Sequence, residues 1–132
     1  MTLLEQINAH SLPFARLVGV EFTSAELDKV TARLVVRPEL CTSGSIVHGG
    51  CLMAFIDTVG AMATAINLGG DAKGTTTIES KTNFIAGAPV GSVLIATSTP
   101  VHRGRRTQVW QTRVEIEGSK LVATAMQTQM VL

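Results

Sequence analysis

The sequence predicts a single α+β domain, residues 1–132, in which a curved antiparallel sheet wraps around one long central helix. Residues 49–68 form a largely apolar stretch of helical length, residues 20–36 alternate with period two before it, and four strand-like runs follow it. One long helix set between strands can bury its apolar surface only against the sheet that those strands form. A chain of 132 residues has room for one such core and not for a second.

The segment before the long helix is expected to hold a short helix and two strands. Thr2 and Glu5 have the spacing of a capping box, which predicts a helix from there to about Ala9, ended by the stretch 11–13. The alternating region that follows is divided near 27–29, so it predicts two antiparallel strands.

The long helix is expected to begin at the turn 48–50 and to end near residue 68, where the glycine pair 69–70 would supply a positive φ just past the helix. Helical spacing directs four side chains toward the sheet: Leu52, Phe55, Ile56 and Val59. Later strands are predicted over 75–85, 92–99, 108–116 and 121–131, with turns at 86–89, 103–105 and 117–119, the last being the clearest hairpin signal.

The charge balance and the apolar content bound the kind of protein. A net charge of +1 with 16% charged residues gives no electrostatic footprint for nucleic acid. The hydrophobic fraction of 45% and the mean hydropathy of +0.32 are high for a small soluble chain, so part of the surface is expected to be buried against another subunit. The sequence therefore predicts a homo-oligomer.

Several features predict a cytoplasmic protein that is neither secreted nor inserted in a membrane. Residues 1–10 lack the basic and long apolar regions of a signal peptide. Asp57 interrupts the apolar stretch 49–68, which could otherwise be taken for a membrane span. Cys41 and Cys51 lack the spacing of a redox or metal motif and are expected to be reduced thiols.

Neither metal nor cysteine chemistry is expected. The three histidines, His10, His48 and His102, are too scattered for a metal site. Cys51 lies near the predicted helix N-terminus, where a lowered pKa could make its thiol a nucleophile, but a small residue packed in the helix start is the preferred interpretation.

Asp57 is the most informative residue of the long helix, and we expect it to be buried. A carboxylate among aliphatic neighbours is costly unless a partner compensates it or a function uses it. Helical spacing places Gly60 and Ala61 on the same face, which leaves room for another backbone or a ligand. The alternative is a structural carboxylate that bonds to a loop.

The start of the long helix has the features of an oxyanion site. Gly49 and Gly50 present unpaired N–H groups and the positive end of the helix dipole, and they carry no side chain that would block a carbonyl. Asp57 lies about 10 Å farther along the axis, too far to act on a carbonyl held there. A second helix running antiparallel across a two-fold axis would bring the two parts together, so the spacing favours a homodimer with composite sites.

The sequence resembles a known family at these residues. His48, Gly49 and Gly50, followed by Asp57 nine residues after the histidine and then by the strand 75–84 with its Thr, Glu, Lys and Asn-Phe side chains, are similar to the PaaI-type branch of the hotdog-fold acyl-CoA thioesterases. The similarity covers nearly the whole chain. It implies a hotdog-fold dimer, often paired into tetramers, that hydrolyses thioesters of coenzyme A, which is part of the substrate, with no metal or redox cofactor.

The resemblance also implies roles for individual residues. The Gly49 N–H, with Gly50 beside it, would polarise the thioester carbonyl, while His48 fixes the geometry of the turn. Asp57 of the neighbouring subunit would attack the carbonyl as a nucleophile or activate water as a general base, and the sequence leaves both routes open.

Two threonines match further family positions. Thr42, six residues before the histidine, stands where relatives often carry an amide side chain that orients water or substrate, and Thr77 matches a hydroxyl that positions water. Glu79 and Lys81 are expected to form a cross-strand or surface charge pair.

A basic turn lies between two predicted strands. Arg103, Arg105 and Arg106 could bind the phosphate groups of coenzyme A, since arginine forks suit phosphate oxygens. An ordinary solvated basic turn is an equally good interpretation.

Two other functions are compatible with the fold. A hydratase or dehydratase of acyl thioesters would need a differently placed histidine and a proline-containing helix entry, neither of which is found. A non-catalytic acyl-CoA binding module would usually carry a DNA-binding segment, for which 132 residues leave no room.

Overall fold

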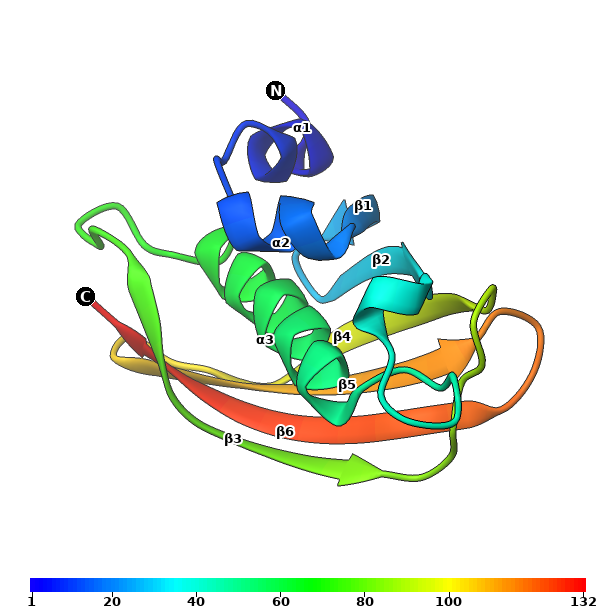
Figure 1. Ribbon diagram of the computed structural model, residues 1–132. Coiled ribbons are helices and arrows are strands. Elements are labelled where there is room, and N and C mark those ends of the chain that lie inside the picture. Colours follow the sequence, from blue (N-terminus) through cyan, green and yellow to red (C-terminus); the bar gives the residue numbers. More distant parts are fainter.

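A six-stranded antiparallel sheet curves around the long helix α3 (Gly49–Ala65) in the computed structural model, which describes residues 1–132 (Figure 1). The strands are β1 (Glu21–Glu26), β2 (Lys29–Val35), β3 (Thr75–Phe84), β4 (Val93–Arg103), β5 (Thr107–Ile116) and β6 (Leu121–Val131). Their order across the sheet is β1-β2-β4-β5-β6-β3, and every neighbouring pair is antiparallel. The predicted α+β architecture is confirmed.

The N-terminal region holds two short helices, of which the sequence predicted one. In α1 (Leu3–Asn8) the capping box is present, with the Thr2 hydroxyl accepting from the Glu5 N–H at 3.1 Å and the Glu5 carboxylate accepting from the Thr2 N–H at 2.7 Å. The stretch 11–13 was expected only to end this helix, but Pro13 begins a second one, α2 (Pro13–Val18). Proline suits the first position of a helix because its missing N–H would have no partner there.

The long helix ends earlier than expected. Its last residue is Ala65, and the glycine pair 69–70 lies beyond the end without a positive φ, so the predicted glycine stop is wrong. The side-chain amide of Asn67 donates to the carbonyl of Ala63 at 2.9 Å and to that of Leu27 in the β1–β2 turn at 2.8 Å. The helix therefore ends where one side chain bonds to the Ala63 carbonyl in its last turn and ties the helix to the sheet.

Helix α3 lies against the concave side of the sheet, while α2 lies on the other side of the helix (Figure 1). The four side chains predicted to face the sheet are all buried, at 0 to 3% exposure: Leu52, Phe55, Ile56 and Val59. Each such burial contributes about 1.5–3 kcal/mol to stability. No helix of the structure combines the length and the apolar character needed to cross a bilayer.

The inner face of β6 carries two fully buried glutamines, Gln127 and Gln129. A Cβ on Gly60 would overlap the carboxamide of Gln127, so the missing side chain of this glycine is what admits the glutamine beneath the helix. The sequence predicted room at Gly60 for a backbone or a ligand. The room exists, but a side chain of the same chain fills it.

We predict that Gly60→Ala destabilises the protein by about 1–3 kcal/mol, measured by urea unfolding, because the added methyl group overpacks the space under the helix. Helix propensity alone predicts the opposite, a gain of about 0.5–1 kcal/mol. Ala61→Gly, at the next and partly exposed position, is the control for helix propensity without overlap. It should lower the stability by about 1 kcal/mol, the usual difference between alanine and glycine in a helix. A Gly60→Ala protein as stable as the wild type would show that Gln127 can be accommodated elsewhere.

Candidate active site

Asp57 lies on the exposed side of α3, which corrects the expectation that it is buried. Its neighbours in sequence are apolar, but successive residues of a helix turn by about 100°, and the buried positions 55, 56 and 59 belong to the opposite face. The apolar stretch thus contains a single charged residue, and this residue faces outward.

Side chains from the sheet hold one oxygen of the Asp57 carboxylate. Oδ1 accepts a hydrogen bond from the Thr77 hydroxyl at 2.6 Å and a longer one from the Gln127 amide at 3.3 Å. The Thr77 hydroxyl in turn accepts from the Gln129 amide at 2.6 Å. Oδ2 has no hydrogen-bond partner within the chain, so this oxygen is free to act on a ligand.

Two clefts meet at Asp57. The α2–α3 cleft has a volume of about 280 Å³ and is mainly apolar, with Phe14 and Met62 among the residues that line it. The α3–β3 cleft has a volume of about 300 Å³ and is lined by Met53, Ala54, Asp57, Thr77 and Ser80. A carboxylate with one free oxygen therefore stands at the wall of both spaces.

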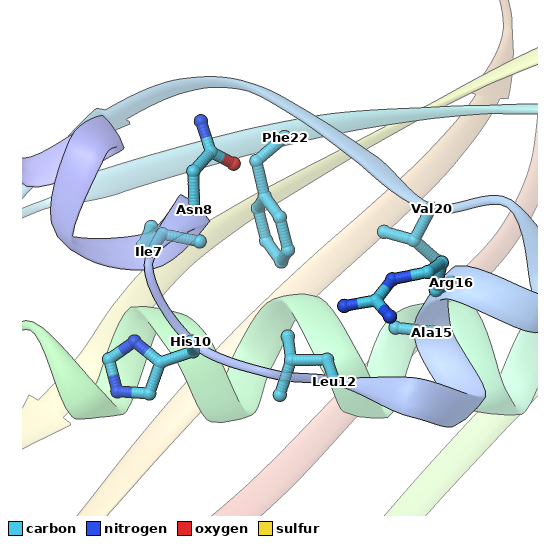
Figure 2. Close-up of a pocket in the computed structure, with 8 residues that line it drawn as sticks. All are labelled: Ile7, Asn8, His10, Leu12, Ala15, Arg16, Val20 and Phe22. Atoms are coloured by element: carbon cyan, nitrogen blue, oxygen red, sulfur yellow. The ribbon is translucent and has the colours of Figure 1, made fainter.

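A third and smaller cleft, shown in Figure 2, lies among α1, α2 and β1 and has a volume of about 170 Å³. His10 and Arg16 are its titratable residues, and no predicted catalytic or phosphate-binding residue lines it. It adjoins the α2–α3 cleft, with which it shares Leu12 and Ala15, but Asp57 is not among the residues that line it.

The start of α3 presents one unpaired amide, where the sequence predicted two. The His48 side chain caps the helix, because its Nδ1 accepts from the Gly50 N–H at 2.7 Å. The Gly49 N–H has no acceptor within the chain. Gly50 is thus already engaged, and Gly49 is the candidate oxyanion donor.

Gly49 and Asp57 are not brought together within one chain. They are eight residues apart on a regular helix, which corresponds to about 12 Å along its axis. The ring of Phe84, at the end of β3, lies beside Gly49, where a Cβ would be 3.2 Å from its Cε1 atom.

The two cysteines lie near the helix start but do not form a reactive pair. Burial raises the pKa of the Cys51 thiol above its ordinary value, with a smaller opposing influence from Arg37 and a small further increase from Cys41. The lowered pKa that a thiol nucleophile would need is therefore contradicted.

Thr42, in the loop before the helix, is exposed, and its N–H donates to the carbonyl of Ile46 at 2.8 Å.

The basic turn lies at the other end of α3. Arg103 donates to the carbonyl of Leu27 at 3.2 Å and to the side chain of Asn67 at 3.4 Å, so it ties the helix end to the β1–β2 turn. Arg105 and Arg106 are exposed and line a separate cleft of about 440 Å³. The structure gives Arg103 a structural contact and leaves the other two free for a ligand.

The charge pair that the sequence predicted on β3 is not formed. Glu79 accepts from the Thr128 hydroxyl at 2.7 Å and forms no ion pair with Lys81, so the predicted charge pair is wrong.

The sequence did not identify Gln127 and Gln129 as site residues. The available signal was their position, since the alternation of residues 121–131 directs both side chains inward, where polar groups are rare.

Comparison with known proteins identifies the family. The sequence pattern of the thioesterase superfamily matches residues 44–123, more than half of the chain, and the chain belongs to this superfamily. The matched region includes the helix start, Asp57 and β3. The resemblance drawn from the sequence is thereby confirmed.

Individual relatives agree with this assignment. The Mycobacterium tuberculosis protein named "Putative esterase Rv1847" is 32% identical over 115 residues, which cover 86% of this chain and 81% of the relative. The 1,4-dihydroxy-2-naphthoyl-CoA hydrolase of Listeria monocytogenes is 27% identical over 105 residues, covering 80% and 84%. These names support a hydrolase.

Solved structures confirm the hotdog fold. A mutant of thioesterase PA1618 from Pseudomonas aeruginosa superposes with a TM-score of 0.89 at 25% identity, covering 98% of this chain and 93% of that one. The Escherichia coli PaaI protein has a TM-score of 0.87 at 20% identity, covering 99% and 96%, and shows the shared fold.

We predict that His48→Ala lowers the free energy of unfolding by about 1 kcal/mol, because the Gly50 N–H loses its acceptor. His48→Asn supplies a side-chain oxygen at the same helix cap and is expected to retain most of the stability. Urea unfolding of both variants and the wild type measures the difference. Equal losses for alanine and asparagine would mean that the imidazole acts by packing and not as a cap.

Proposed function

We propose that the protein hydrolyses acyl-CoA thioesters to the free acid and coenzyme A, and does so as a dimer with two composite sites. The observation that carries this proposal is the Asp57 carboxylate, held through one oxygen and free at the other, at the wall of an apolar cleft. The superfamily and the names of the relatives support the reaction class.

The chemistry needs a group that stabilises negative charge on the carbonyl oxygen. The unpaired Gly49 N–H at the start of a 17-residue helix is suited to this, because it adds the positive end of the helix dipole to a hydrogen bond. Asp57 then either attacks the carbonyl carbon to form an anhydride, which water hydrolyses, or takes a proton from the attacking water. In both routes the thiolate of coenzyme A leaves and is protonated.

The distance between Gly49 and Asp57 along one helix supports a site shared between two copies of the chain. Strand β3 is an edge of the sheet with unpaired backbone groups, and Ile78, Phe84 and Met53 are large apolar side chains exposed along or beside it. A second copy placed on this edge would cover them and bring its helix start toward Asp57. The pairing of such dimers into tetramers is part of the same proposal.

The remaining parts of the substrate have candidate positions. The α2–α3 cleft beside Asp57 would take the acyl group, bounded by Phe14 and Met62. Arg105 and Arg106 would meet phosphate groups of coenzyme A, and the Thr42 hydroxyl would orient water or substrate. No metal or redox cofactor enters this scheme, and coenzyme A is part of the substrate.

Single turnover in isotopically labelled water distinguishes the two routes. Label that enters the Asp57 carboxyl group marks an anhydride intermediate that water attacks at the aspartyl carbonyl. Label found only in the released acid shows attack of water at the acyl carbon, the outcome expected of general-base catalysis.

We predict that Asp57→Asn lowers kcat for acyl-CoA hydrolysis by at least about a hundredfold, because the amide can neither attack nor accept a proton. Gly49→Pro should also be inactive, since proline fits the first helix position but lacks the N–H. Gly49→Ala keeps the N–H and serves as the reference for the added Cβ beside Phe84.

Mixing the two inactive variants tests the shared site directly. Random exchange of protomers makes half of the dimers mixed, and each mixed dimer has one intact site, so about a quarter of the wild-type activity should return. The exchange of protomers is verified separately. If no activity returns although exchange has occurred, Asp57 and Gly49 act within one chain, or not at all.

We predict that Phe14→Ala changes acyl preference by about tenfold in kcat/KM, favouring larger groups, because it widens the α2–α3 cleft. The measurement compares aryl-acetyl, hydroxybenzoyl and medium-chain thioesters. Arg16→Ala is the matched control, since this residue belongs to the same helix but lines the cleft of Figure 2. The same preference in both variants would place the acyl group elsewhere.

A further inference from the structure

We infer that Gln127 and Gln129 are positioning residues for Asp57, which hold its carboxylate by one oxygen and leave the other for the reaction. This inference rests on the proposed function, which gives Asp57 its task. Both glutamines are fully buried beneath α3, and neither can touch a substrate in the clefts directly.

The hydrogen bonds through Thr77 have only one consistent direction. The Gln129 amide nitrogen donates to the Thr77 hydroxyl at 2.6 Å, and a hydroxyl has a single proton to give. That proton therefore goes to Asp57 Oδ1, also at 2.6 Å. The Thr75 hydroxyl lies 3.0 Å from both the Gln129 amide oxygen and the carbonyl of Met130, so it does not decide the amide orientation. Thr77 decides it, because a turned amide would set two acceptors, its own oxygen and Asp57 Oδ1, against the one Thr77 proton.

Strand geometry supports this chain of hydrogen bonds. Thr77 and Gln129 stand opposite each other in the β3–β6 pair, and the register shifts directly after Thr77, between it and Glu79. A bulge of this kind redirects the side chains next to it. The Thr77 hydroxyl thereby lies between the buried Gln129 amide and the carboxylate on the helix.

Gln127 supplies the second donor at a cost in stability. Its amide nitrogen lies 3.3 Å from Asp57 Oδ1, while its oxygen is buried without a hydrogen-bond partner. Turning the amide over would place its oxygen against the carboxylate, so two acceptors would face each other. A buried acceptor without a partner is destabilising, and an apolar residue would suit stability better. The arrangement is explained if it serves Asp57.

The combined effect is to restrict the carboxylate. Rotation about the Cβ–Cγ bond would exchange its two oxygens, but both donors reach the same one, Oδ1. Holding a reacting group in one orientation lowers the entropic cost of reaching the transition state. Oδ2 is then the oxygen presented for attack or proton transfer.

The test uses the full chain and a coenzyme A thioester that the wild type hydrolyses. We expect Gln129→Met and Gln127→Met each to lower kcat by about tenfold with little change in KM, because the donor is lost while the side-chain volume remains. Gln127→Met is further expected to be at least as stable as the wild type in urea. Loss of turnover without loss of stability is a result that a merely structural glutamine would not give.

Gln108 provides a matched control within the same sheet. It is equally buried, at 1% exposure, but donates to the carbonyl of Asn67 and accepts from the Trp110 indole, with no contact to Asp57. Because Gln108 also lines the cleft beside Arg105 and Arg106, the comparison uses kcat at saturating substrate. Gln108→Met should lose stability and keep this kcat. At Thr77, serine should restore the activity that valine removes, and Thr77→Val combined with Gln129→Met should be no worse than Thr77→Val alone.

The inference is overturned if Gln127→Met and Gln129→Met retain the wild-type kcat, or if they lose activity only as far as they lose stability. It is overturned together with the proposed function if the wild type hydrolyses no acyl-CoA or if Asp57→Asn is fully active. An inactive Asp57→Asn protein beside fully active glutamine variants would remove the inference alone.

Discussion

The packing of α3 against the concave face of the sheet is the constraint on which the rest of the structure depends. Phe55, Ile56 and Val59 hold the helix against the strands, and this fixes the direction in which every other side chain of the helix points. Asp57 consequently lies on the outer side of the helix, within hydrogen-bond distance of Thr77 on β3 and of Gln127 on β6. A rigid helix also places its own N-terminus about 12 Å from that carboxylate.

The space between helix and sheet is not uniformly apolar. Gly60 admits Gln127, and Gln129 lies behind Thr77, so a polar layer runs beneath one side of α3. Such a layer weakens a core unless all its groups are paired, and one oxygen of Gln127 is not. This loss of stability occurs beside the candidate carboxylate. Proteins commonly depart from optimal core packing where a functional site and the core share residues.

The two ends of α3 have different tasks in this arrangement. At its start, the His48 cap uses the Gly50 N–H and leaves that of Gly49 free. At its end, Asn67 and Arg103 bind backbone carbonyls and join the helix to the β1–β2 turn. The first end therefore keeps one N–H unpaired, whereas side chains hold the second end to the sheet.

The sequence by itself determined the six strands, the long helix and their order, although it did not reveal α2. The capping box of Thr2 and Glu5, the alternation in the strands and the apolar face of the long helix depend on spacing within a few residues, and these patterns predicted one helix wrapped by one sheet. Asp57 and Gly49 were found for the same reason, since a charge in an apolar run and a glycine pair at a helix start are local signals.

Only the tertiary structure decided which groups meet. Gln127 reaches Asp57 across 70 residues of chain, and Arg103 reaches Leu27 across 76, so no local pattern could reveal either contact. The exposure of Asp57, the use of the Gly50 N–H by His48 and the filling of the space at Gly60 were also settled by packing. Spacing along the chain specifies the direction of a side chain, whereas its partner depends on how separate elements come together.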